Sequence, residues 1–170
     1  MRILTCTPPW LGLALSLSFS LAARSGYADE LKDRILSLRE QADITNQILE
    51  DRLDTVVPQV MRAAGIDAWV LIAREYNEDP IVKTMLPATW LNARRRTVLM
   101  FIDQGPELGV ARMAVARYPV GDLFPGVWNP ELQPDQYERI AQILDEADPD
   151  RIALNYSDVY ALADGLTYSE

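Results

Sequence analysis

The sequence predicts an α/β fold, and three observations support this prediction. Helical patterns alternate along the chain with short apolar runs that are typical of buried strands. The clearest junction is residues 61–73, where a helical pattern stops at Gly65 and six apolar residues follow. The turn pair Gly105-Pro106 separates two further strand patterns, which indicates an antiparallel hairpin. We therefore expect a sheet built around the strand that follows Gly65.

Length and composition limit the possibilities further. The 170 residues correspond to one domain, and 49% of them are apolar, which is enough for a sizeable core. The formal net charge of −9 argues against a nucleic-acid partner, because a phosphate backbone requires a Lys/Arg surface. It equally argues against a polybasic membrane contact.

The first 28 residues have the pattern of a secretory signal peptide. Arg2 supplies the positive charge, residues 11–21 form an apolar run, and small residues follow, with Ala22, Ala23 and Ala28 as candidate cleavage positions. The run is shorter than the roughly 20 residues of a membrane span, with an uncleaved anchor as the alternative. The single cysteine, Cys6, would leave with this segment. A cysteine-free product fits a bacterial periplasm better than a small disulfide-stapled secreted domain, and we expect an exported protein, periplasmic or secreted.

Two helical patterns precede Gly65. The first covers residues 29–51 and the second ends at Gly65, while Pro58 predicts either a kink or a fresh helix start capped by Asp54. The apolar stripe expected on the first helix consists of Leu31, Ile35, Leu38, Ala42 and Leu49. The inward side chains expected on the second are Val56, Val57, Val60, Met61 and Ala64.

The rest of the chain continues the alternation. The expected strands are residues 66–73, 97–102, 109–118 and 151–155. The expected helices are a short one within residues 80–90, one over residues 134–147 and one over residues 157–163. The apolar stripe expected on the helix over residues 134–147 consists of Tyr137, Ile140, Ile143, Leu144 and Ala147.

The chemistry of the side chains does not indicate catalysis by this chain. The sequence contains no histidine, which removes the commonest general base and most transition-metal sites. The glycine spacings match neither nucleotide-binding fingerprint. Glu75, Glu78 and Asp79 invite a metal interpretation, but their spacing is not that of a calcium loop, which favours a solvated loop. We therefore expect no catalytic or metal-binding residue in this chain.

Two features leave a binding role open. The run Arg94-Arg95-Arg96 could bind an anion or a carboxylate, or it could be the exposed lip of a strand that forms salt bridges. Trp128, in the proline- and glycine-rich segment 119–134, could be a lid over the core or an anchor for a partner.

The order of these elements resembles a known family. A long leading helix is followed by Gly-Ile-Asp-Ala-Trp-Val at residues 65–70, Arg-Arg-Thr-Val-Leu-Met-Phe at residues 95–101, a hairpin, a helix, and Asp-Arg-Ile-Ala-Leu-Asn at residues 150–155. Over about residues 36–170 this resembles the N-terminal domain of Xaa-Pro aminopeptidases and prolidases, the creatinase-like metallopeptidases. Glu-Tyr-Asn-Glu-Asp-Pro at residues 75–80, with the signal peptide, is similar to the exported bacterial branch.

The resemblance implies a mixed sheet flanked by helices, similar to a ribonuclease H core. It also implies that catalysis belongs to a C-terminal domain, where two Asp, one His and two Glu hold two divalent metals (manganese, cobalt or zinc). A metal-bridging water there attacks the peptide bond that precedes proline. No cofactor is expected in this chain itself. The implied partners are its own catalytic domain, further subunits of a homo-oligomer and, for the parent protein, proline-containing peptides.

What the family leaves to such a domain is oligomer contact and closure of the substrate cleft. Trp90, Arg94 and Trp128 are the candidate contacts, with local packing as the alternative for each. Residues 167–170, Thr-Tyr-Ser-Glu, form a capping box that predicts a helix start, so we expect a truncated chain. Residues 29–170 would then be the N-terminal domain, without its catalytic domain. The alternative is a standalone periplasmic interaction or ligand-binding module.

Overall fold

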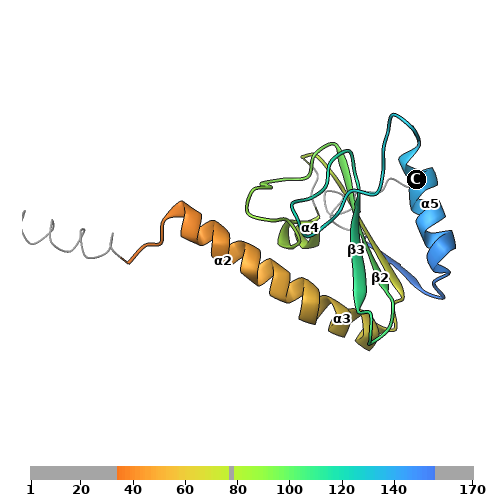
Figure 1. The fold of residues 1–170 in the computed structure, drawn as a ribbon, viewed down its shortest axis with the longest axis horizontal. Helices are drawn as coiled ribbons and strands as arrows, with labels where there is room; N and C mark the ends of the chain where they lie inside the picture. Colours follow the sequence, from red (N-terminus) through yellow and green to blue (C-terminus); the bar gives the residue numbers. More distant parts are fainter. Residues whose placement is uncertain (1–33, 77–78, 156–170) are drawn as a thin grey trace, which may run out of the picture. The chain divides into compact units, whose positions relative to one another are not determined.

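The computed structural model of the chain describes residues 34–76 and 79–155, which fall into two units divided after Gln41 (Figure 1). In the first unit Ser37 and Glu40 form a capping box: the Glu40 amide donates to Ser37 Oγ at 3.3 Å, and the Ser37 amide donates to Glu40 Oε2 at 2.8 Å. The hydrogen bonds from Ser37 lower the pKa of Glu40. The first helix, α2 (Leu38–Asp51), therefore begins at Leu38, and the prediction that it already runs through residues 34–37 was wrong. The expected signal peptide and cleavage position lie outside the described residues.

The helical segment before Gly65 is continuous but irregular. After α2 comes a π-helical turn, η1 (Arg52–Val56), and then α3 (Val57–Ala64). Pro58 lacks an amide hydrogen, and its ring would clash with the carbonyl of Asp54 in a regular α-helix, so the wider turn accommodates it. Asp54 caps no helix; it lies within the turn and forms a salt bridge to Arg112 at 2.6 Å. The predicted interruption is present, but it is not a fresh helix start at Asp54.

The buried side of this segment differs from the predicted one. Leu49, Leu53, Val57 and Met61 are buried and follow one another at intervals of four residues. A four-residue interval drifts by about 40° per step in an α-helix, and the wider π-turn offsets part of that drift. Of the described side chains that were expected to face inward, only Leu49, Val57 and Met61 are buried, and Ala42 is half-buried. Exposed instead are Ile35, Leu38, Val56, Val60 and Ala64. Leu31 lies outside the described residues.

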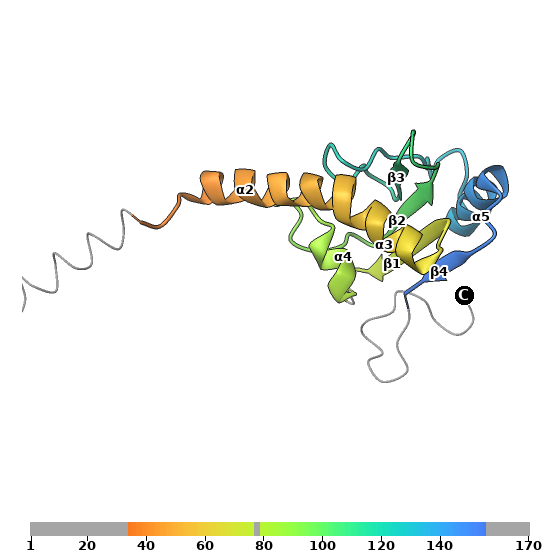
Figure 2. The ribbon, with the colours of Figure 1, turned by 90° about the horizontal axis from the view of Figure 1, so that it is seen from below.

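The sheet has four strands in the order β3-β2-β1-β4. The strands are β1 (Ala68–Arg74), β2 (Arg96–Asp103), β3 (Val110–Val115) and β4 (Ile152–Leu154). Strand β2 pairs antiparallel with both β1 and β3, whereas β4 pairs parallel with β1 at the edge (Figure 2). The prediction of an α/β fold with a mixed sheet is therefore confirmed. The third strand is shorter than the expected residues 109–118.

Helices cover both faces of the sheet, which explains the continuous apolar run in β1. Leu71 and Ala73 of β1 face the core that α3 and α4 (Pro80–Thr84) cover. Val70 and Ile72 face the opposite core, beneath α5 (Gln136–Ala147). Figure 1 shows α3 and α5 on opposite sides of the strands. A helix within residues 80–90 and one near residues 134–147 were both predicted; their polar caps are Asp79 and Asp135.

The buried face of α5 differs slightly from the predicted apolar stripe. Ile140 and Ile143 are buried and Leu144 packs beside them, as expected, but Ala147 is exposed. Gln136, a polar residue, is buried because its side-chain amide donates to Val115 O at 2.6 Å and to Arg96 O at 3.2 Å. These two hydrogen bonds attach the start of α5 to β2 and β3.

Gly65 ends α3 as predicted. It is left-handed, with φ 63°, and the Gly65 and Ile66 amides donate to Arg62 O and Met61 O at 3.1 and 2.9 Å. A Cβ at Gly65 would lie 3.0 Å from Nη1 of Arg151, whose guanidinium donates to Ala64 O. The left-handed conformation therefore favours glycine there, and a Cβ at this position would also require the Arg151 guanidinium to shift slightly.

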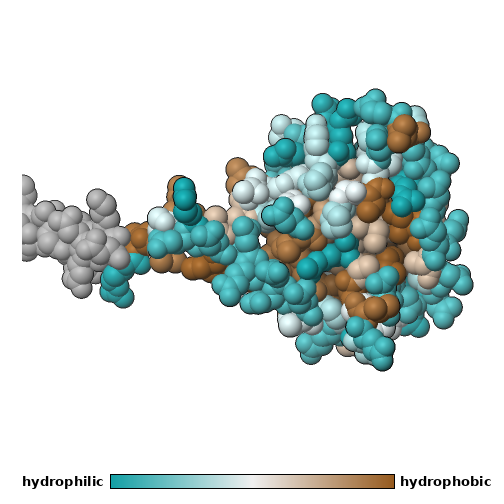
Figure 3. All heavy atoms as spheres, viewed as in Figure 1, coloured by the Kyte–Doolittle hydropathy of each residue, from teal (hydrophilic) through white to brown (hydrophobic). Residues whose placement is uncertain are grey.

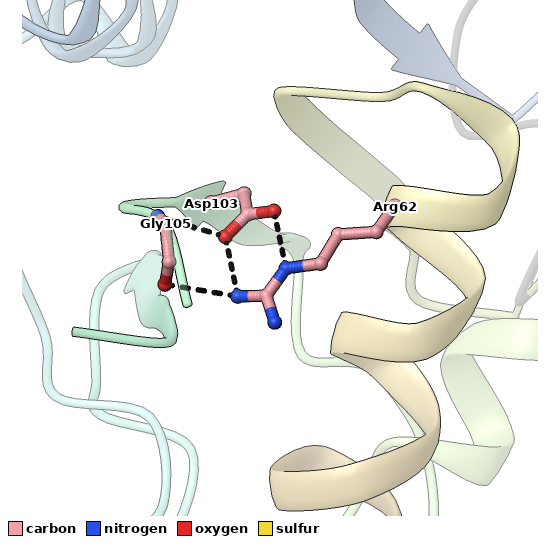
Figure 4. Close-up of polar contacts among 3 residues, drawn as sticks. All are labelled: Arg62, Asp103 and Gly105. Atoms are coloured by element: carbon pink, nitrogen blue, oxygen red, sulfur yellow. Dashed lines mark hydrogen bonds and ion pairs between the residues drawn. The ribbon is translucent and has the colours of Figure 1, made fainter. Parts of the chain in front are cut away.

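An ion pair joins the end of α3 to the β2–β3 turn (Figure 4). Arg62 donates through Nε and Nη2 to the two carboxylate oxygens of Asp103, at 2.9 and 2.8 Å, and through Nη2 to Gly105 O at 2.9 Å. The hydrogen bonds from Arg62 lower the pKa of Asp103, and the Asp103 carboxylate raises the pKa of Arg62.

None of the helices described is long and apolar enough to cross a membrane.

Candidate functional site: an arginine-lined cleft

An open cleft of about 1060 Å³ lies at the end of the sheet opposite the Arg62–Asp103 pair. Its lining combines positive charge with aromatic surface. The arginines in the lining are Arg74, Arg95, Arg96 and Arg117. The aromatic residues in it are Tyr76, Tyr118 and Trp128.

Strand register brings these residues together. Strands β1 and β2 are antiparallel, and Arg74 at the end of β1 is the direct partner of Arg96 at the start of β2. Because β3 is antiparallel to β2, Arg117 and Tyr118, just beyond the end of β3, return to the same edge. Gln136, attached to β2 and β3, places the first residue of α5 beside them. The cleft is therefore built from segments that are far apart in the sequence.

The backbone of the cleft is strained at two positions. Tyr76 and Arg95 have φ of 68° and 57°, and they are two of the three non-glycine residues with positive φ in the part of the chain that the structure describes. Such a conformation costs about 1–3 kcal/mol per residue. Hydrogen bonds hold it in place: the Glu75 amide donates to Arg95 O at 2.7 Å, and the Arg95 amide donates to Glu75 Oε2 at 3.2 Å.

Among the described residues of the lining, positive charge exceeds negative charge. The two carboxylates among them, Glu75 and Asp135, accept backbone amide hydrogen bonds, from Arg95 and from Tyr137 and Glu138 respectively. Arg117 pairs with Glu131 at 2.9 Å, where both side chains are largely exposed and such pairs contribute little. Guanidinium groups present planar pairs of N–H donors that match carboxylate and phosphate oxygens. The arrangement is suited to holding an anion.

Of the residues that the sequence singled out, Trp90 and Arg94 lie together, away from the cleft lining. The Arg94 guanidinium stacks over the Trp90 ring, 4.7 Å from its centroid, and Trp90 packs against the α3-side core. Trp128 lines the cleft and packs against the α5-side core, with Nε1 donating to Gln133 O at 2.8 Å. A contact of any of the three with substrate or another subunit stays a prediction.

The sequence interpretation named the arginine run but missed most of the cleft. Arg95 and Arg96 line it, whereas Arg94 does not. Arg74 and Arg117 had no signal of their own, because only the strand pairing places them beside the run. Pairing the strands outward from the predicted hairpin could have identified Arg117.

The acidic residues do not assemble into a metal site in the described ranges. No group of three or more His, Cys, Asp or Glu side chains able to hold a metal ion occurs within residues 34–76 and 79–155. Asp79, from the acidic loop, is buried and caps α4 by accepting from the Ile81 and Val82 amides at 2.6 and 3.2 Å. The expectation of a solvated loop was therefore wrong for Asp79, and Glu78 lies outside the described residues. The side chains described do not fit a two-metal centre.

Aliphatic side chains are exposed along the long helical segment. Ile44, Ile48, Val56 and Val60 are each between 44% and 50% exposed. A second hollow, of about 340 Å³, begins at Val60 and is lined mainly by apolar residues. In the space-filling view, hydrophobic areas in brown alternate with hydrophilic areas in teal on the face shown (Figure 3).

Comparisons of the chain with protein-family models, with curated proteins and with solved structures found no match.

Proposed function

We propose that this chain is the non-catalytic N-terminal domain of an Xaa-Pro aminopeptidase-like metallopeptidase. The parent protein would release the residue that precedes proline, using two divalent metals held by a C-terminal domain. The observation that carries the proposal is the order of elements. The elements follow one another in the same order as the family-like motifs. They are a long helical segment, a left-handed glycine, a central strand, an antiparallel hairpin, a helix and a parallel edge strand. A creatinase-type domain related to a ribonuclease H core has this composition of elements.

Within the parent, we assign this domain to subunit contacts and to closure of the substrate cleft. The exposed aliphatic residues of the helical segment support a contact role, because Ile44, Ile48, Val56 and Val60 expose apolar surface to solvent in the isolated domain. The parent is proposed to be exported, with residues 1–28 removed. N-terminal sequencing of the protein from a periplasmic or secreted fraction should then begin at residue 29.

The gene itself gives the sharpest test. An in-frame continuation past codon 170 that encodes the Asp, Asp, His, Glu and Glu ligands is expected. Deleting residues 29–170 from that parent should lower kcat/KM on Xaa-Pro peptides and alter its oligomeric state in size-exclusion chromatography with light scattering. The chain of residues 29–170 should not cleave these peptides, even with manganese added. Cleavage by it, or a stop codon directly after Glu170, would contradict the proposal.

A second candidate function is a standalone ligand-binding module. The specific observation in its favour is the arginine-lined cleft, which is assembled entirely from residues of this chain. The two functions differ in what they require. The peptidase proposal requires a downstream catalytic domain, whereas the binding module requires only that the cleft take up a ligand.

A further inference from the structure

We propose that the arginine-lined cleft binds a small organic anion: a carboxylate or phosphate monoester carried on an aromatic or aliphatic body. The inference rests on the second candidate function and does not depend on the peptidase assignment. Four features of the cleft carry it: charge, backbone conformation, aromatic surface and size.

The charge of the lining indicates an anion. Arg74 and Arg96 are direct partners on paired strands, and the Arg96 guanidinium lies over the Tyr137 ring, 4.6 Å from its centroid. Arg95 and Arg117 add two more guanidinium groups at the same edge. This concentration occurs in a chain whose formal net charge is −9. An oxyanion in the cleft would accept paired N–H donors from these guanidinium groups.

The strained backbone independently marks the same place. Arg95 contributes one guanidinium of the lining while held in the left-handed region, with φ 57°, and Tyr76 across the β1–β2 pair has φ 68°. The reciprocal Glu75–Arg95 hydrogen bonds maintain this geometry. Strained non-glycine residues cluster at ligand sites, because the strain fixes a side chain where the ligand needs it.

The aromatic residues define the body of the ligand. Tyr76 and Tyr118 are 83% and 52% exposed, so their rings are available to a molecule in the cleft. Trp128 is fixed by its indole hydrogen bond to Gln133 O, which gives a wall of set orientation. Aromatic side chains supply large contact areas and stack against planar groups. They would favour a planar or aliphatic body over a bare ion.

The size of the cleft agrees with this class of ligand. A volume of about 1060 Å³ is comparable to sites for drug-sized molecules and is far larger than a single phosphate ion. A nucleic acid is disfavoured, because the chain has a formal net charge of −9, whereas a polyanion requires an extended Lys/Arg surface.

Isothermal titration calorimetry on the full chain tests the proposal with four probes. Hippurate and phenyl phosphate represent the carboxylate and phosphate sources, hippuramide is the neutral analogue, and inorganic phosphate lacks the body. Binding of at least one aromatic anion is expected, about tenfold or more tighter than hippuramide and than inorganic phosphate. The double variant Arg95→Gln, Arg117→Gln should weaken that binding at least tenfold.

Arg39→Gln is the matched control. Arg39 is exposed on α2 and is absent from the cleft lining, so its substitution should leave the affinity within twofold. Circular-dichroism melts of all variants separate lost binding from lost folding, and the single variant Arg95→Gln replaces the double one if that unfolds. If Arg39→Gln weakens binding as much as the cleft variants do, the effect is general charge and the proposal fails.

The remaining outcomes separate the two levels of the argument. Equal binding of hippurate and hippuramide would overturn the anion class while leaving a ligand-binding cleft. Binding of inorganic phosphate as tight as that of phenyl phosphate would overturn the role of the aromatic walls. Binding of none of the four probes would overturn the anion proposal. None of these results bears on a downstream catalytic domain.

Discussion

The two ends of the β1–β2 pair use arginine in opposite ways. At one end, Arg62 forms a bidentate ion pair with the carboxylate of Asp103 and also donates a hydrogen bond to the carbonyl oxygen of Gly105 in the turn. At the other end, Arg74 faces Arg96 across the strands, with Arg95 beside them in a left-handed conformation. The first arrangement fastens a helix to a hairpin. The second concentrates positive charge around an open cleft.

The difference separates arginines that serve the fold from arginines that suit a ligand. Asp103 is a charge-matched partner whose pKa is lowered by Arg62, so its ionised form stabilises the folded chain. In the cleft, Glu75 and Asp135 are instead directed to backbone amides. Substitutions should therefore affect stability at the first end and binding at the second.

A large-to-small substitution in the hydrophobic core should have the largest effect on stability. Phe101 is 1% exposed and packs edge-on against Phe124, with ring centroids 5.8 Å apart. Phe101→Ala should lower the free energy of unfolding by about 3–5 kcal/mol, measured by urea denaturation. Leu132→Ala, at a residue 84% exposed, is the control and should change it by less than about 0.5 kcal/mol. A loss below about 1 kcal/mol for Phe101→Ala would contradict the described core.

A substitution at the C-terminal end of α3, the helix that carries Arg62, should have the next largest effect on stability. Gly65→Ala should cost about 1–2 kcal/mol, because alanine is strained at positive φ and its Cβ would approach Arg151. Asparagine tolerates the left-handed conformation better than alanine does. Gly65→Asn should therefore cost less than Gly65→Ala, as thermal unfolding of the two variants can establish. Equal losses would show that backbone strain at position 65 is not the source of the loss.

The Arg62–Asp103 pair should have a smaller, pH-dependent effect. Asp103→Asn should lower the free energy of unfolding by about 1 kcal/mol at pH 7. Because the pKa of Asp103 is lower in the folded than in the unfolded chain, this stabilisation is present above the unfolded value, about 3.9. It is lost as the pH falls through the folded value.

Denaturation curves of the wild type and of Asp103→Asn should therefore converge as the pH is lowered from 7 towards 3. The exposed Asp122 offers a matched control, and Asp122→Asn should follow the wild type throughout. A gap between wild type and Asp103→Asn that is the same at every pH would mean that the ion pair is not its source.

The smallest effect on stability is expected in the cleft. Arg95 and Arg117 are exposed, and the ion pair of Arg117 with Glu131 is largely solvated. The double variant Arg95→Gln, Arg117→Gln should therefore change the free energy of unfolding by less than about 0.5 kcal/mol. A large destabilisation would place these arginines with Arg62 among the structural ones and would remove the contrast between the two ends.

Local patterns predicted most of the elements, since caps, turns and apolar runs are short-range properties. Gly65 and the Gly105-Pro106 turn are examples, because each imposes its conformation on its neighbours. The buried side of the long helical segment was predicted only in part. Pro58 is accommodated by a π-turn, and the inward positions continue through Leu53 to Val57 and Met61 instead of shifting to Val56 and Val60.

The cleft could be predicted only in part for a different reason. Arg95 and Arg96 were visible as a charged run, but Arg74 and Arg117 join them through strand register, which is a long-range property. The positive φ of Arg95 likewise had no sequence signal, because arginine is not a residue that favours it.

The most direct test of the contrast is an amide NMR titration of the chain with hippurate and with phenyl phosphate. Our account predicts that the amide signals of Glu75, Arg95 and Gln136 shift saturably, while those of Asp103 and Gly105, at the opposite end of the strands, do not. Shifts centred on Asp103 and Gly105, or no saturable shift at Arg95 with either probe, would contradict it.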